Sequence, residues 1–190
     1  MLLPRPLLPP PRPAPRHALS IEPVPLSSEK ASALADAGVA TVTLAPGLVF
    51  ALARDSRLLT RAELVAQGRR PEDALAEAFA DARLTAGALG LAPLGLHDAP
   101  VLTNHTHHPH AAAALGDLPL LRALRAAAGK NLLLAAPSPS RVFVALDLPR
   151  LDAALARLVA AASRLEARLL SPFVYRFDGL KLSLATASVC

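Results

Sequence analysis

Two hydrophobic periodicities alternate along this chain and divide it into strand-like and helix-like segments. Runs rich in β-branched and apolar residues, separated by short turn sequences, predict three β-hairpins, at 39–44 with 48–53, at 131–136 with 141–146, and at 173–177 with 180–184. Both strands of the second hairpin are apolar enough to be buried. The third contains Asp178-Gly179, a dipeptide that tight hairpin turns favour.

Between these hairpins, apolar residues recur at steps of three and four and predict amphipathic helices, at 28–37, from Thr60 to about Gln67, from Pro71 onward, at 118–128 and at about 149–169. Thr60 and Glu63 have the spacing of a capping box, whereas Asp117 is a predicted N-cap and Gly129 a left-handed stop. The longest helix has an apolar seam expected to face the core, formed by Leu151, Leu155, Leu158, Ala162, Leu165 and Leu169.

Hairpins that alternate with helices predict an α+β fold, with a mainly antiparallel sheet built from hairpins, packed against amphipathic helices and covered on one face. Residues 21–190 are expected to form a single domain, and residues 1–20 a disordered leader rich in proline and arginine. Residues 88–110 carry the least regular pattern, with short extended pieces expected only at 94–96 and 101–103.

Charge and aromatic content argue against nucleic acid as a partner. The net charge is +5, of which Arg5, Arg12 and Arg16 of the leader contribute +3, so the rest of the chain carries about +2. Aromatic residues make up 3% of the chain, with no tryptophan. A groove for single strands needs clustered basic groups and stacking aromatic rings, and this composition offers neither.

Cysteine and apolar content bear on location. The single cysteine, Cys190, cannot form an internal disulfide, which favours a reducing compartment. No apolar run is long enough to span a membrane, and prolines interrupt the leader where a signal peptide needs an unbroken apolar stretch. A cytoplasmic protein without membrane contact is expected.

A histidine cluster at 105–110 is the most chemically suggestive feature of the chain. His105 and His107 would share one face of an extended strand, and His108 and His110 the other. Two imidazoles with a carboxylate from Asp98 or Asp117 would make three ligands of an open zinc site, whose bound water could support hydrolysis. The spacing matches no established zinc motif, so the simpler interpretation is a solvated loop without a cofactor.

Other catalytic patterns are absent from the sequence. No serine lies in a G-x-S-x-G turn, no glycine-rich phosphate loop stands between a strand and a helix, and Ser138 and Ser140 are explained by the chemistry of a proline-rich turn. The chain therefore favours a non-enzymatic interaction or regulatory module, with a protein partner or a second copy of itself as the binding target. The alternative is a zinc-binding protein, with or without hydrolytic activity, that uses the histidine cluster at 105–110.

Short stretches in a fixed order carry a resemblance to a known family, at 49–55, 61–75, 134–145 and 172–179. They include Arg61-Ala62-Glu63-Leu64 before Gly68, and Pro172-Phe173-Val174-Tyr175-Arg176-Phe177-Asp178-Gly179. In this order, residues 39–182 resemble an uncharacterised bacterial family known only as a domain of unknown function. The resemblance implies a small cytoplasmic α+β protein and supplies no activity and no functional residues.

Overall fold

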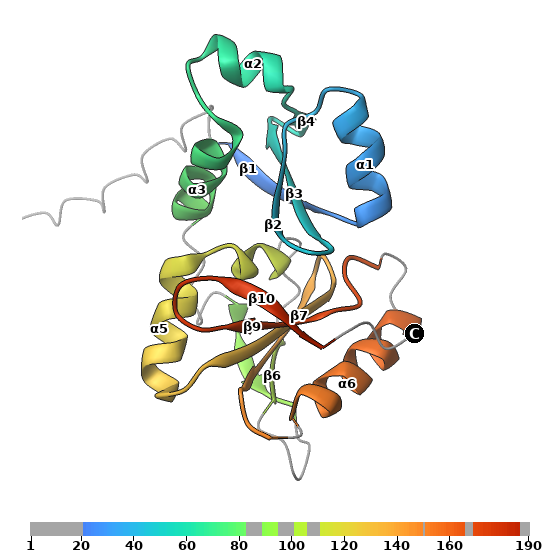
Figure 1. Ribbon diagram of the computed structural model, residues 1–190, viewed down its shortest axis with the longest axis vertical. Coiled ribbons are helices and arrows are strands. Elements are labelled where there is room, and N and C mark those ends of the chain that lie inside the picture. The colour runs from blue at the N-terminus through green and yellow to red at the C-terminus, as the bar shows by residue number, and fades with distance from the viewer. Residues whose placement is uncertain are drawn as a thin grey trace, which may run out of the picture.

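A computed structural model describes residues 21–82, 89–94, 101–105, 111–149, 151–165 and 169–186 of the chain. It is an α+β fold with two antiparallel sheets, which Figure 1 shows one above the other. The leader at 1–20 lies outside the described residues.

The first sheet has the strand order β1-β3-β2, with β4 paired to β3, and its strands are β1 (Glu22–Leu26), β2 (Thr41–Ala45), β3 (Leu48–Arg54) and β4 (Arg57–Leu58). The hairpin expected around Pro46-Gly47 is confirmed, with Val42 opposite Phe50. Strand β1 was not anticipated, because Pro23 and Pro25 argue against a strand. Pairing on only one side, with β3, explains their presence, since a proline lacks the N–H that a central strand must donate.

The second sheet has six strands in the order β10-β9-β7-β8-β6-β5, with every pair antiparallel. Its strands are β5 (Leu91–Pro93), β6 (Val101–Asn104), β7 (Leu132–Ser138), β8 (Arg141–Leu146), β9 (Val174–Phe177) and β10 (Leu182–Thr186). The second and third predicted hairpins are confirmed as β7–β8 and β9–β10. Strand β5 ends at Pro93, and of the extended piece expected at 94–96 only Leu94 lies within the described residues.

Apolar side chains cover the six-stranded sheet on both faces, so the expectation of one covered face was wrong. Successive residues of β7 alternate between two clusters, with Leu132 and Leu134 in one and Leu133 and Ala135 in the other. Helix α6 packs on the second cluster, and helix α5 contributes to the first. Figure 1 shows these two helices on opposite sides of the sheet.

The helices are α1 (Ser28–Asp36), α2 (Arg61–Ala66), α3 (Pro71–Ala82), α5 (Leu118–Ala128) and α6 (Leu151–Leu165). The capping box of α2 is confirmed, because the Glu63 N–H donates to Thr60 and the Thr60 N–H donates to Glu63. The seam of α6 was predicted too long. Leu151 and Leu155 are buried, but Leu165 is 88% exposed and Leu169, 45% exposed, follows the helix.

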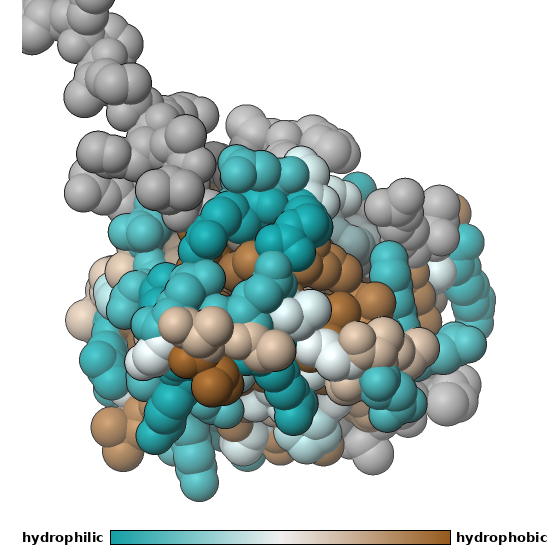
Figure 2. Space-filling view, turned by 90° about the horizontal axis from the view of Figure 1, so that it is seen from above, coloured by the Kyte–Doolittle hydropathy of each residue, from teal (hydrophilic) through white to brown (hydrophobic). Residues whose placement is uncertain are grey.

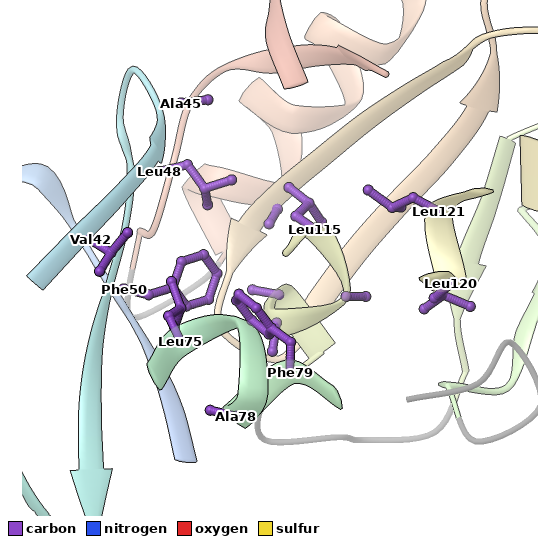
Figure 3. Packing of buried hydrophobic residues seen from close by; sticks show 14 of the residues in the cluster. Val42, Ala45, Leu48, Phe50, Leu75, Ala78, Phe79, Leu115, Leu120 and Leu121 are labelled. Atoms are coloured by element: carbon purple, nitrogen blue, oxygen red, sulfur yellow. The ribbon is translucent and has the colours of Figure 1, made fainter. Parts of the chain in front are cut away.

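The largest core cluster draws residues from both sheets. Phe50 of β3 meets Phe79 of α3 edge to face, with ring centroids 5.2 Å apart. A short 3-10 helix, η1 (Ala111–Leu115), lies fully buried in the same cluster. Figure 3 shows Leu115 between the phenylalanine pair and Leu121 of α5. Small alanine side chains allow the backbone of η1 to lie close to its neighbours.

A buried hydrogen-bond network joins the two sheets near the β2–β3 turn. The Tyr175 hydroxyl of β9 donates to the carbonyl oxygen of Pro46 at 3.0 Å and lies 2.6 Å from Ser171 Oγ. Gly47 has a φ of +72°, and a Cβ there would lie 2.5 Å from the Phe173 ring. A glycine is therefore required in this turn by both its backbone conformation and its close packing.

Candidate functional site

The six residues named as possible zinc ligands fall mostly outside the described residues. Asp98, His107, His108 and His110 lie outside them, so the structure addresses only His105 and Asp117. His105 is exposed at the end of β6, and its backbone N–H donates to Gly90 O at 3.1 Å. Within the described ranges, no three His, Cys, Asp or Glu side chains lie close enough together to hold a metal ion. The zinc hypothesis remains a prediction from sequence.

Asp117 has a structural role that accounts for its position. Its carboxylate accepts a hydrogen bond from the Leu120 N–H at 3.0 Å and caps α5, as the sequence predicted. Burial raises the pKa of this carboxyl group, although the hydrogen bond from Leu120 opposes the shift. The burial of Asp117 and its hydrogen bond from Leu120 both belong to its role as a helix cap, and neither requires a bound ion.

The polar residues before the histidine cluster fasten β6 to the β7–β8 turn. Asn104 Nδ2 donates to Ser140 O at 2.8 Å, and the Val142 N–H donates to Asn104 Oδ1 at 2.9 Å. Thr103 Oγ1 donates to Val142 O at 3.0 Å. Ser138 is buried and lies 3.4 Å from Ser140 through their hydroxyl groups. These contacts provide hydrogen-bond partners for polar groups of the β7–β8 turn, and they give Ser138 and Ser140 a structural role.

An open apolar pocket of about 240 Å³ lies where α5 crosses the six-stranded sheet. The described residues that line it, called here the α5 pocket, are all aliphatic, namely Leu102, Leu124, Ala128, Leu132, Val144, Ala145 and Leu146. They come from α5 and from three neighbouring strands, β6, β8 and β7. These elements hold the pocket walls in place.

A small side chain on α5 contributes to the empty volume. The apolar stripe of α5 runs from the buried Leu121 to the half-buried Leu124, and the next position on that face is Ala128. Ala145 is part of the lining, but its methyl group belongs to the cluster on the opposite face of the sheet, which α6 covers. An enclosed apolar cavity of about 150 Å³ is large enough to bind benzene. The α5 pocket can therefore accept an aliphatic or aromatic side chain.

Basic residues gather at the C-terminal end of α5, at a surface called here the basic corner (Arg122, Arg125, Lys130 and Lys181). Arg125 Nε donates to Asn131 Oδ1 at 3.1 Å, and Arg122 Nε donates to Gly179 O at 3.2 Å. The first bond joins α5 to the residue before the pocket-lining Leu132, and the second joins α5 to the β9–β10 turn. The corner therefore adjoins the pocket at the end of the helix.

The chemistry of this surface suits binding. The described lining of the α5 pocket contains no nucleophile, acid, base or metal ligand. Sequence reasoning predicted an amphipathic helix at 118–128, whose apolar stripe includes Leu124, and missed the pocket. The available signal was an alanine at position 128 of that stripe, together with three basic and no acidic residues between Leu118 and Asn131.

A second apolar area lies at the end of the molecule that carries α1 and α2. Figure 2 views this end from above and shows apolar residues in a band bordered and crossed by polar side chains. Val65 of α2 is 70% exposed. Since hydrophilic residues interrupt the band, the α5 pocket is the better-formed candidate site.

Searches for similar proteins assign no family to this fold and site. Among its described residues the chain has no helix long and apolar enough to cross a membrane. No protein-family model, curated protein or solved structure matches the chain.

Proposed function

We propose that this protein is a non-enzymatic interaction or regulatory module that binds a partner protein through the α5 pocket. The observation that carries the proposal is the pocket itself, an open apolar recess lined by aliphatic side chains from four elements. Apolar recesses of this kind hold the anchor side chains that dominate many protein interfaces. The proposal agrees with the lack of a catalytic motif in the sequence.

A cytoplasmic location accompanies this proposal. The only cysteine cannot form an internal disulfide, and the resemblance to an uncharacterised bacterial family implies the same compartment. A partner would accordingly be sought among intracellular proteins.

The test fills the pocket without altering the surface charge. In Ala128→Phe the new ring occupies the recess, so binding of a partner anchor is expected to be lost while the protein stays folded. Ala126→Phe is the matched control, because Ala126 lies on the exposed side of the same helix. Wild type and both variants are immobilised, exposed to lysate of the source organism and compared by quantitative mass spectrometry, with circular dichroism to confirm folding.

The expected result is a partner retained by the wild type and by Ala126→Phe but reduced at least tenfold on Ala128→Phe. Retention of the same proteins by all three forms would contradict a role for the α5 pocket. Turnover of a substrate by the wild type in an activity screen, with no partner bound, would contradict the proposed function as a whole.

A further inference from the structure

We infer that the partner segment is acidic and carries one large apolar side chain, which enters the α5 pocket while neighbouring carboxylates contact the basic corner. This inference rests on the proposed function and adds the chemistry of the partner. It is drawn from the charge around the pocket, which the proposed function does not use.

Charge at the end of α5 is one-sided. Between Leu118 and Asn131 the chain has Arg122, Arg125 and Lys130 and no acidic residue, and Lys181 adds a fourth basic group. The nearby Asp178 carboxylate accepts hydrogen bonds from the Leu180 N–H at 2.8 Å and the Lys181 N–H at 3.0 Å. Four positive charges and this one negative charge leave the corner at about +3.

Acidic side chains neutralise only part of the positive charge of the corner, since Asp178 attracts Lys181 electrostatically without forming an ion pair with it. Both arginines are held by neutral acceptors, an amide oxygen and a backbone carbonyl. Within the described part of the chain, none of the four basic residues forms an ion pair, whereas four arginines elsewhere do, namely Arg57, Arg69, Arg70 and Arg176. The guanidinium groups of Arg122 and Arg125 retain further N–H groups that can donate hydrogen bonds to a carboxylate.

The α5 pocket and the basic corner lie close together, so the apolar and acidic groups of a partner must also be close together. Leu124, which lines the pocket, is followed by Arg125, and Asn131, which holds Arg125, is followed by the pocket-lining Leu132. Leu180 in the adjoining turn is 77% exposed and offers a further apolar contact. A segment anchored in the pocket would therefore carry its flanking residues across the basic corner.

Two other occupants fit these features less well. A second copy of the chain related by a two-fold axis would bring two basic corners together, and their repulsion would oppose association. A long acyl chain needs a larger space, because pockets for drug-sized ligands measure about 300–1,000 Å³, above the volume of the α5 pocket. An acidic peptide with a single anchor matches both volume and charge.

The test begins with an unbiased peptide selection. A library of random dodecapeptides displayed on phage is selected on the wild type after depletion on the Ala128→Phe variant, so that the recovered peptides depend on the pocket. We expect the recovered peptides to combine a large aliphatic or aromatic residue with flanking Asp or Glu.

Binding of the recovered peptides is then measured by fluorescence anisotropy. The variant Lys130→Glu with Lys181→Glu reverses the charges of two exposed side chains of the basic corner. The affinity of this double variant for the peptides is expected to be about tenfold lower than that of the wild type. The affinity of the wild type is expected to weaken when salt is added. The matched control reverses two exposed arginines of α6, Arg157→Glu with Arg164→Glu, and is expected to stay within about twofold of the wild type.

The outcomes separate the two proposals. Pocket-dependent peptides without acidic residues, or an unchanged affinity for Lys130→Glu with Lys181→Glu, would overturn the acidic-partner inference and leave the proposed function standing. Recovery of no peptide, or equal binding to wild type and Ala128→Phe, would overturn both. Saturable binding of decanoate that Ala128→Phe abolishes, with no acidic peptide recovered, would assign the pocket to acyl chains and overturn the inference.

Discussion

Gly116 lies directly against the ring of Phe79, and the space between them is too small for a methyl group. A Cβ built on Gly116 would lie 2.0 Å from Phe79 Cζ. Phe79 is buried and packs on Phe50, so its ring cannot move away freely. This contact lets the segment after η1 turn into α5 beside the core.

The substitution Gly116→Ala is expected to lower the free energy of unfolding by about 1–3 kcal/mol, because the added methyl group overpacks the core. Urea denaturation followed by circular dichroism measures the loss. The double variant Phe79→Leu with Gly116→Ala should be less destabilised than the sum of the single variants, since removing the ring makes room. Strictly additive effects would contradict the proposed clash.

At the scale of elements, the turn between β3 and β4 carries strain that the strands impose. Arg54 pairs with Arg57, which leaves Asp55 and Ser56 as a two-residue loop. Both have positive φ angles, 50° and 64°, as a type I′ turn requires. Glycine and asparagine adopt this conformation at lower cost than serine, so the hairpin is held by its strands against the preference of its turn.

Replacing Ser56 by glycine is expected to raise the free energy of unfolding by about 0.5–1 kcal/mol, because glycine removes the left-handed strain. The matched control is Ser32→Gly on the exposed side of α1, where the same change should lower stability by a similar amount. Thermal unfolding of both variants beside the wild type checks this. A loss of stability in Ser56→Gly would show that the turn is not strained.

Elements also show where pattern reasoning succeeds and where it stops. The capping box of α2 and the Asp117 cap of α5 were predictable, because each depends on residues three apart in sequence. The seam of α6 was predicted as far as Leu169, whereas the helix ends at Leu165 with that side chain exposed. An apolar period marks positions that can be buried, and only the extent of the opposing sheet decides which are.

At the scale of the whole molecule, Tyr175 joins parts of the chain that are far apart in sequence. Its hydroxyl group connects β9 to the turn between β2 and β3, across 129 residues. Burial raises the pKa of Tyr175 to about 12, from a usual value of 10.0. The protonated hydroxyl is thus favoured in the folded state, where it can donate to Pro46.

This shift predicts a loss of stability at alkaline pH. The contribution of Tyr175 should be fully present below about pH 10 and lost as the pH rises toward about 12, since the unfolded chain releases the proton first. The chain has one tyrosine and no tryptophan, so tyrosinate absorbance reports this residue alone. The folded protein should titrate near 12, and the urea-unfolded protein near 10.

The control for this prediction is Tyr175→Phe. It should lower the free energy of unfolding at neutral pH by about 1–2 kcal/mol, through the hydrogen bonds lost at Pro46 and Ser171. Its stability should then change less between pH 10 and 12 than that of the wild type. An equal alkaline loss in both proteins would place the titrating group elsewhere.

Sequence alone determined the features that depend on neighbouring residues. The α+β class, the three hairpins, the two predicted caps and the buried β7–β8 pair follow from period, turn residues and capping spacing, and all are present in the structure. The lack of a recognisable catalytic motif is likewise a property of the sequence alone.

Only the tertiary structure decided the features that arise between distant segments. The division into two sheets, the coverage of the six-stranded sheet on both faces and the buried alanine helix η1 depend on long-range packing that no local pattern records. The α5 pocket has the same origin. Ala128 is an ordinary alanine of a helix in sequence, and it borders a recess only because α5 crosses β6, β8 and β7 beside it.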